Sequence, residues 1–194
     1  MSAHDALLDA YQSILRDTGE RATTLTAVAA RAGVSKGGLL YHFASKEALA
    51  EGLIARLDAL VEEDLALMRE AADGPSRYYV RTSVWTGGAL DTTFVAVAQL
   101  AQESHAAARR AMQRAREQWL ELILEEVGEE ATAHAILLLG DGLYFDAALT
   151  GDPTRSGEGA QAAGPGRLSP EQLLPIVDRL LHAARGRAGG VSGR

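Results

Sequence analysis

Apolar residues recur every three or four positions along most of the chain, and this spacing limits the fold more than any other feature of the sequence. The spacing places apolar side chains on one face of an α-helix, whereas a half-buried β-strand needs strict alternation of apolar and polar residues. No segment shows that alternation. The first segment is typical, and its apolar positions precede Gly19: Leu7, Leu8, Tyr11, Ile14 and Leu15. The sequence therefore predicts an all-α fold of about nine helices.

Glycine, proline and capping residues divide this pattern into separate helices. A hydroxyl oxygen accepts a free backbone N–H at the amino end of a helix, which suits Thr24, Ser45, Ser104 and Ser169. The predicted helices after the first span residues 25–32, 36–43, 46–72, 77–85, 91–102, 106–127, 130–149 and 170–184. Residues 151–167 contain five glycines and two prolines, so they predict a loop. We expect the tail from residue 185 onward to be disordered.

The composition indicates a globular protein. The chain has 194 residues, of which 47% are apolar, so one domain or two small ones can bury a core. It has no cysteine, which excludes disulfides, thiol nucleophiles and cysteine-based metal sites. No apolar run approaches the roughly 18 residues of a membrane span, and the amino end lacks the basic and apolar stretches of a secretory signal. We therefore expect a cytoplasmic protein without a membrane partner.

Charge is distributed unevenly along the chain. The formal net charge is −7, yet residues 1–50 carry five basic and five acidic residues. Between Glu20 and Glu47 there is no acid, and the basic residues are Arg21, Arg31, Lys36 and Lys46. A local positive field suits a phosphate backbone. An acid-free window of this length also arises by chance.

The predicted helices 25–32 and 36–43 are short and are joined by a tight turn, which is the arrangement of a helix-turn-helix. Gly33 can adopt the positive φ that ends the first of them, and Val34 can fill the angle between the two. Gly37 and Gly38 are poor helix formers. Their bare backbone would allow the second helix to approach the major groove of DNA closely.

The start of the fourth predicted helix also points to an anion. Lys46 stands in its first turn, where a cation opposes the helix dipole at a cost of a few tenths to about 1 kcal/mol. This placement is reasonable if an anion occupies that helix end, where free N–H groups also point.

Residues 24–49, TLTAVAARAGVSKGGLLYHFASKEAL, resemble the DNA-binding segment of TetR-family transcriptional regulators, and with the first helix the resemblance covers about residues 5–55. It implies a DNA-binding domain over residues 1–46, a helical effector-binding and dimerisation domain over 47–186, and a disordered tail over 187–194. The expected function is that of a repressor that binds a palindromic operator as a homodimer and is released by a small effector.

The motif and the resemblance together imply a set of DNA-binding residues: Thr24, Thr26, Ser35, Lys36, Gly37, Gly38, Leu40, Tyr41, His42 and Lys46. Leu40 departs from the family, which usually has an aromatic residue there, and it could touch a thymine methyl group instead. Thr24 and Ser45 could also be helix caps alone, and Tyr41 and His42 could pack between helices.

The rest of the chain resembles the family only in its helical architecture. Two helices with wide apolar faces are candidates for a dimer interface, through Ile136, Leu139, Leu143, Leu173, Val177, Leu180 and Leu181. The alternative is that these residues form the core of a monomer. Candidates for a pocket that takes a hydrophobic or weakly polar effector are Met68, Trp85, Phe94, Gln99, His105, Met112, Trp119 and Tyr144. Each of these could equally be a core residue.

Catalysis finds no support in the sequence. It contains no Gly-x-Ser-x-Gly, no phosphate loop and no histidine pair at metal-ligand spacing, so we expect no enzyme, no metal and no cofactor. The alternative to a DNA-binding regulator is a helical ligand-binding or protein-interaction dimer that does not bind an operator.

Overall fold

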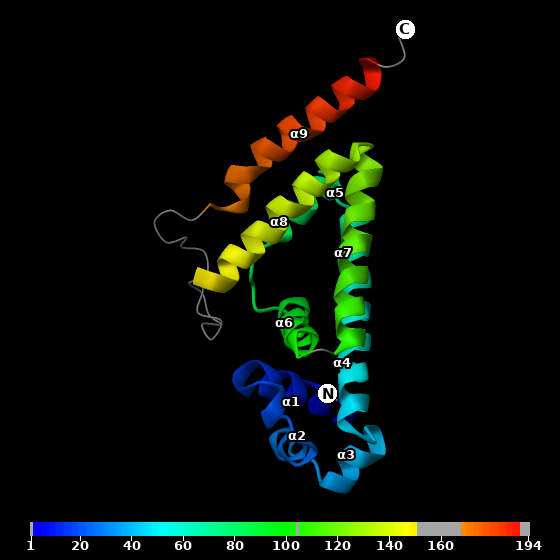
Figure 1. Cartoon of the computed structure of the whole chain (residues 1–194), viewed down its shortest axis with the longest axis vertical. Coiled ribbons are helices and arrows are strands. Elements are labelled where there is room, and N and C mark those ends of the chain that lie inside the picture. Colours follow the sequence, from blue (N-terminus) through cyan, green and yellow to red (C-terminus); the bar gives the residue numbers. More distant parts are fainter. Residues whose placement is uncertain (1, 104, 151–167, 191–194) are drawn as a thin grey trace. The chain divides into compact units, whose positions relative to one another are not determined.

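The computed structural model of the chain describes residues 2–103, 105–150 and 168–190 (Figure 1). Over these ranges the secondary structure consists of nine α-helices and one short 3₁₀ helix, with no strand, which confirms the predicted all-α fold. The helices are α1 Ala3–Thr18, η1 Glu20–Ala22, α2 Leu25–Ala32, α3 Lys36–His42, α4 Lys46–Arg69, α5 Pro75–Thr82, α6 Ala89–Gln102, α7 Ala106–Val127, α8 Glu130–Thr150 and α9 Pro170–Gly190. No helix in the described ranges is long and apolar enough to cross a membrane.

Several helix ends differ from the prediction because distant or neighbouring side chains supply the caps. The helix α5 starts at Pro75 rather than residue 77, since the Glu126 carboxylate accepts the Ser76 N–H at 2.8 Å. It ends at Thr82 instead of residue 85. The helix α6 starts at Ala89, where the Asp91 carboxylate accepts the N–H of Gly88 at 3.3 Å.

The last helix is longer than predicted. The helix α9 continues to Gly190, so the expectation of disorder from residue 185 is wrong for residues 185–190. Arg187 shows why, because its guanidinium donates to Thr132 Oγ1 at 3.2 Å and lies 3.5 Å from a Glu129 carboxylate oxygen on the preceding segment. The predicted loop 151–167, the cap Ser104 and residues 191–194 lie outside the described residues.

The chain divides into two compact units. The first contains residues 1–62 and 88–115, and the second contains residues 63–87 and 116–194. The helices α4 and α7 each contribute their amino-terminal part to the first unit and their carboxyl-terminal part to the second. The first unit therefore contains more residues than the predicted DNA-binding domain 1–46. The boundary at residue 46 stays a prediction.

The core of the first unit joins α1 to the short helices that follow it. Every apolar position predicted for α1 is buried, and α3 contributes Leu39 and Phe43 to the same core. Gly52 on α4 makes room for this packing, since a Cβ there would lie 2.8 Å from Phe43 Cε1 and 3.2 Å from Leu8 Cδ2. An absent side chain on α4 thus allows the aromatic ring at the end of α3 to be buried.

The second unit is a packed set of helices in which α5 contacts both α8 and α9. Its fully buried apolar side chains include Val80, Ile123, Ile136 and Val177. Polar side chains also join its helices, and the Tyr79 hydroxyl on α5 donates to Asp141 on α8 at 2.8 Å. This unit is therefore held by its own core.

We expect Gly52→Ala to lower the free energy of unfolding by about 1–3 kcal/mol, because the added methyl group overpacks a filled site. Urea unfolding followed by circular dichroism measures the change. The matched control is Gly37→Ala on α3, where a Cβ would meet only Ser35 Oγ at 4.0 Å. That variant should be as stable as the wild type or more stable by up to about 1 kcal/mol. Equal stabilities of Gly52→Ala and wild type would contradict this account of the packing.

Candidate DNA-binding surface

The turn between α2 and α3 has the geometry that the sequence predicted. Gly33 ends α2 in the left-handed region, with φ of 68°, and its N–H is directed to the carbonyls of Ala29 and Ala30. The N–H of Val34 donates to the Ala29 carbonyl at 3.0 Å. These bonds satisfy the last carbonyls of α2 and set the direction in which α3 begins.

Hydroxyl groups cap both helices of the motif. The Thr24 hydroxyl accepts the Ala27 N–H at 3.1 Å, and the Ser35 hydroxyl accepts the Gly38 N–H at 3.0 Å. Both side chains are exposed. Each cap uses the hydroxyl oxygen as an acceptor, so the hydroxyl hydrogen remains available for an outside acceptor such as a phosphate.

The helix α3 buries one face and presents the other to solvent. Leu39 and Phe43 face the core, whereas Tyr41 is 86% exposed and Leu40 is 42% exposed. His42 is exposed as well, and the Tyr41 and His42 rings meet edge to face with centroids 5.2 Å apart. Both side chains therefore lie on the outer side of α3, and their contact with DNA stays a prediction.

The absence of a side chain has a different physical cause at each of the two glycines of α3. A Cβ at Gly38 would lie 2.8 Å from Val34 Cγ1 and 3.3 Å from Ser35 Oγ, so the turn itself requires a bare backbone there. At Gly37 the nearest atom would be Ser35 Oγ at 4.0 Å. The sequence interpretation gave both glycines the same reason, close approach to DNA. At Gly38 the turn already explains why a side chain is absent. Only at Gly37, where a side chain would fit, is close approach to DNA still needed as an explanation.

Lys46 has an anionic partner within the chain. Its Nζ donates to the Glu20 backbone carbonyl at 2.6 Å and lies 3.2 Å from the Glu20 carboxylate. The sequence argument required an anion near this helix end, and η1 supplies one. Sequence reasoning missed the contact because η1 was not predicted.

Acidic side chains that the fold brings close neutralise part of the positive charge between Glu20 and Glu47. Arg31 donates to Ser13 Oγ at 2.8 Å and lies 3.5 Å from an Asp17 carboxylate oxygen, both on α1. Arg21 and Lys36 are exposed and form no ion pair within the described parts of the chain. The positive field that an outside anion would meet therefore comes mainly from these two residues.

We call the ten predicted DNA-binding residues on α2, α3 and the first turn of α4 the reading surface. Nine of them lie on α2, α3 or at the amino ends of these helices, and Lys46 opens α4. Eight of the ten are exposed, and Gly38 and Lys46 are half-buried. The surface is thus accessible within its own unit.

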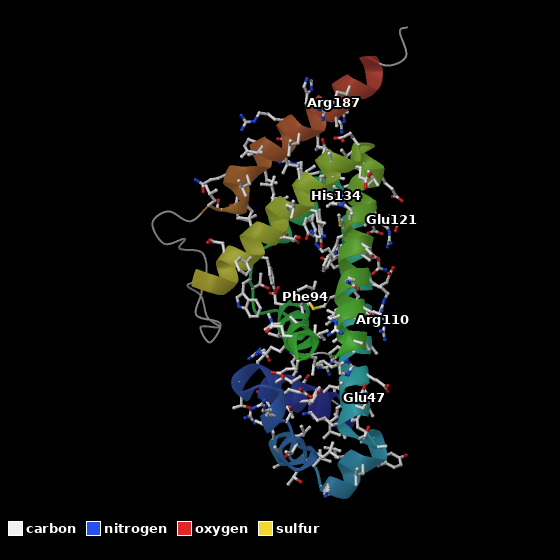
Figure 2. The ribbon with its side chains drawn as sticks, viewed as in Figure 1. Glu47, Phe94, Arg110, Glu121, His134 and Arg187 are labelled. Carbon is white, nitrogen blue, oxygen red and sulfur yellow. The ribbon has the colours of Figure 1, made fainter. Side chains whose placement is uncertain are left out.

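The predicted pocket residues fall into both units. The first unit holds Phe94, labelled in Figure 2, together with Gln99, His105 and Met112, and the second holds Met68, Trp85, Trp119 and Tyr144. The structure therefore does not bring these eight residues together within one unit. Their role in binding an effector stays a prediction.

Three of the pocket candidates have contacts that hold the fold. His105 Nδ1 accepts the Ala108 N–H at 3.3 Å and so caps α7, and its Nε2 lies 3.1 Å from Glu47 Oε1. The Trp119 indole donates to the Asp64 carboxylate at 2.9 Å. Met68 is completely buried. A cap by a histidine was not foreseen, because histidine is not among the preferred capping residues.

Two of the predicted pocket residues in the second unit, Trp85 and Tyr144, are half-buried aromatic side chains. The Trp85 and Tyr144 ring centroids lie 6.2 Å apart at an interplanar angle of 58°. The burial of both rings is incomplete, in contrast to Met68. This pair is therefore the more open part of the predicted pocket set in that unit.

The predicted dimer residues divide by burial. Ile136, Leu173, Val177 and Leu181 are buried within the single chain, so they offer little surface to a partner. Leu139, Leu143 and Leu180 are half-buried. Over residues 130–146 of α8, the large apolar side chains with the highest exposure are Leu138 at 58% and Phe145 at 63%, which sequence reasoning did not select. Periodicity alone cannot tell which of two apolar faces of a helix the chain covers itself.

Residues 7–53 match the model of a protein family described as bacterial regulatory proteins, tetR family. The A-factor receptor protein of Streptomyces griseus is 31% identical over 75 residues, which cover 38% of this chain. Those residues cover 27% of that protein, so the chain spans little more than a quarter of its relative's length. The resemblance seen in residues 24–49 is thereby confirmed.

Several solved structures share the fold over nearly the whole chain. The multidrug binding protein EbrR complexed with malachite green has a TM-score of 0.66 at 20% identity, covering 91% of this chain and 96% of that chain. A transcriptional regulator from Rhodococcus sp. Rha1 has a TM-score of 0.61 at 22% identity, with 94% and 96% covered. GusR of Salmonella enterica has a TM-score of 0.59 at 17% identity, with 95% and 94% covered. At these identities the likeness shows the fold.

We expect Thr24→Ala to lower the free energy of unfolding by about 1 kcal/mol, because the Ala27 N–H loses its capping acceptor. Thr26→Ala is the matched control, since Thr26 is exposed on the same helix and caps nothing. Its effect on stability should stay within about 0.5 kcal/mol. Thermal and urea unfolding measure both variants. Equal losses for the two would mean that the Thr24 cap does not hold α2.

Proposed function

We propose that this chain is a transcriptional repressor that binds a palindromic operator as a homodimer and is released by a small, largely apolar effector. The match of residues 7–53 to the tetR family of bacterial regulatory proteins supports this proposal. The observation that carries the proposal is the reading surface. Capped amino ends of α2 and α3, an exposed lysine and an exposed tyrosine lie together on two short helices.

The chemistry of the reading surface suits double-stranded DNA. Lys36 and Tyr41 can donate to phosphate oxygens or base edges, and the hydroxyls of Thr24 and Ser35 can do the same from the helix caps. The bare backbone of Gly37 would permit close contact with a groove. In the proposed complex, α3 enters the major groove and α2 crosses the phosphate backbone.

A homodimer follows from the need to read two half-sites. One helix-turn-helix makes few base contacts, and dimers place two reading helices about 34–36 Å apart or at a multiple of that spacing. Leu138 and Phe145 are seven residues apart on α8, so they lie on the same helix face, and both are exposed in the single chain. Half-buried Leu139, Leu143 and Leu180 would extend that apolar surface. We propose that this face pairs with its copy around a two-fold axis.

The effector is proposed from the aromatic side chains of the second unit. Trp85 and Tyr144 are half-buried and stand close together. Rings of this kind suit a largely apolar ligand with a few polar groups. Release requires that the effector bind the DNA-incompetent form better than the competent form. A regulator of bacterial transcription works where the DNA is, so we place the protein in the cytoplasm.

The alternative function is a helical dimer that binds a ligand or a protein partner without an operator. Binding of DNA by the purified chain distinguishes the two. A labelled 30-base-pair duplex from the region upstream of its own coding sequence should bind with a strong dependence on salt. Absence of salt-dependent binding at micromolar protein would favour the alternative.

We expect Lys46→Ala to weaken binding of all duplexes about equally and to reduce the salt slope by about one, as loss of a phosphate contact does. Lys36→Ala should instead change the preference among sequences, because its position faces base edges in the proposed complex. Fluorescence anisotropy with the upstream duplex and a random duplex of equal length measures both effects. Arg110→Ala is the matched control, since Arg110 is an exposed cation of the first unit on α7, away from α3 (Figure 2). A loss from Arg110→Ala as large as that from Lys46→Ala would contradict the assignment.

We expect the double variant Leu138→Glu/Phe145→Glu to be a folded monomer, because two buried carboxylates would be unpaired at the proposed interface. Size-exclusion chromatography with light scattering gives the mass of the particle. Leu67→Glu is the control, since Leu67 is 59% exposed on α4 and lies outside the proposed face. That variant should remain a dimer. A dimeric double variant would refute the proposed interface.

A further inference from the structure

The ammonium group of Lys46 is engaged before any DNA arrives. Two acceptors hold it, the carbonyl and the carboxylate of Glu20, at 2.6 and 3.2 Å. An ammonium has three N–H donors, so one remains for an outside acceptor. A phosphate that approaches this third donor meets a neutral ion pair rather than a cation.

We propose that Glu20 is an intramolecular stand-in for a DNA phosphate, which competes for Lys46 and holds the DNA affinity of this chain below its maximum. The inference rests on the proposed function, because it assumes that Lys46 binds the phosphate backbone. Its physical basis is the position of Lys46 in the first turn of α4, where a cation needs a negative neighbour. In the free protein Glu20 is that neighbour, and in the complex a phosphate replaces it.

We call the contact between Glu20 and Lys46 the clamp. The neighbouring carboxylate of Glu47 does not take part in it. Glu47, labelled in Figure 2, follows Lys46 on α4 and lies 3.1 Å from His105 Nε2. Its partner thus lies just before α7, whereas the partner of Lys46 is on η1. Among the acidic residues around the first turn of α4, Glu20 is the one paired with Lys46.

Glu20→Gln tests the clamp, since it removes the carboxylate charge and leaves the backbone carbonyl in place. Fluorescence anisotropy with a labelled 30-base-pair duplex should show about two- to fivefold tighter binding than wild type, the range expected from an exposed ion pair. The gain should shrink as salt is raised. Glu51→Gln is the matched control, because it makes the same charge change at an exposed position on α4, one turn after Glu47. It should change the affinity much less.

A double-mutant cycle with Lys46→Ala separates a clamp from a general charge effect. If Glu20 acts through Lys46, Glu20→Gln gives no gain in the Lys46→Ala background. A gain that persists there, or a folded Glu20→Gln that binds no tighter than wild type, overturns the inference while the proposed function stands. Failure of wild type to bind any duplex with salt dependence overturns both. Thermal unfolding checks that each variant is folded, and Glu20→Asp, which retains the charge, should bind more weakly than Glu20→Gln.

Discussion

The burial of Leu39 and Phe43 is the interaction on which the reading surface depends. The helix α3 has only seven residues and two of them are glycines, so it cannot persist on its own. Its stability comes from the two apolar side chains that it inserts into the first unit. The Phe43 ring reaches its place because α4 has no side chain at Gly52, and the His4 ring of α1 covers it at a centroid distance of 4.8 Å. With one face of α3 held in this way, the opposite face is free to carry residues that the fold does not need.

Electrostatics of the first unit follow from the same arrangement. Packing α1 and η1 against the motif brings Asp17 to Arg31 and Glu20 to Lys46, so acids from outside the basic window neutralise part of it. Such a surface attracts DNA less strongly than its sequence suggests. A weaker nonspecific attraction lets base contacts contribute a larger share of selectivity. The Glu20 clamp would therefore trade affinity for discrimination.

Local signals predicted most of the fold, and contacts distant in sequence account for what they missed. The caps Thr24 and Ser45 and the turn at Gly33 depend on neighbours within a few residues, so the pattern of residue types was enough to place them. The start of α5 depends on Glu126, fifty residues away, and the length of α9 depends on a contact between Arg187 and Thr132. The Glu20 contact to Lys46 spans 26 residues and uses a 3₁₀ turn that has no apolar period. Periodicity also marked Ile136 and Val177 as apolar face residues without telling that their own chain covers them.

The residues that the fold leaves unexplained are the best guide to an outside partner. Gly38 is required by Val34 and Lys46 is satisfied by Glu20, so neither demands DNA. Gly37 weakens a short helix although a side chain would fit there, and Tyr41 exposes most of an aromatic ring to water. Gly37 lowers the stability of the helix and Tyr41 lowers solubility, and both lie on the face of α3 that does not pack against the core. A partner that needs a bare backbone and an aromatic hydroxyl donor at that face accounts for both, and the grooved, phosphate-lined surface of a DNA duplex has those requirements.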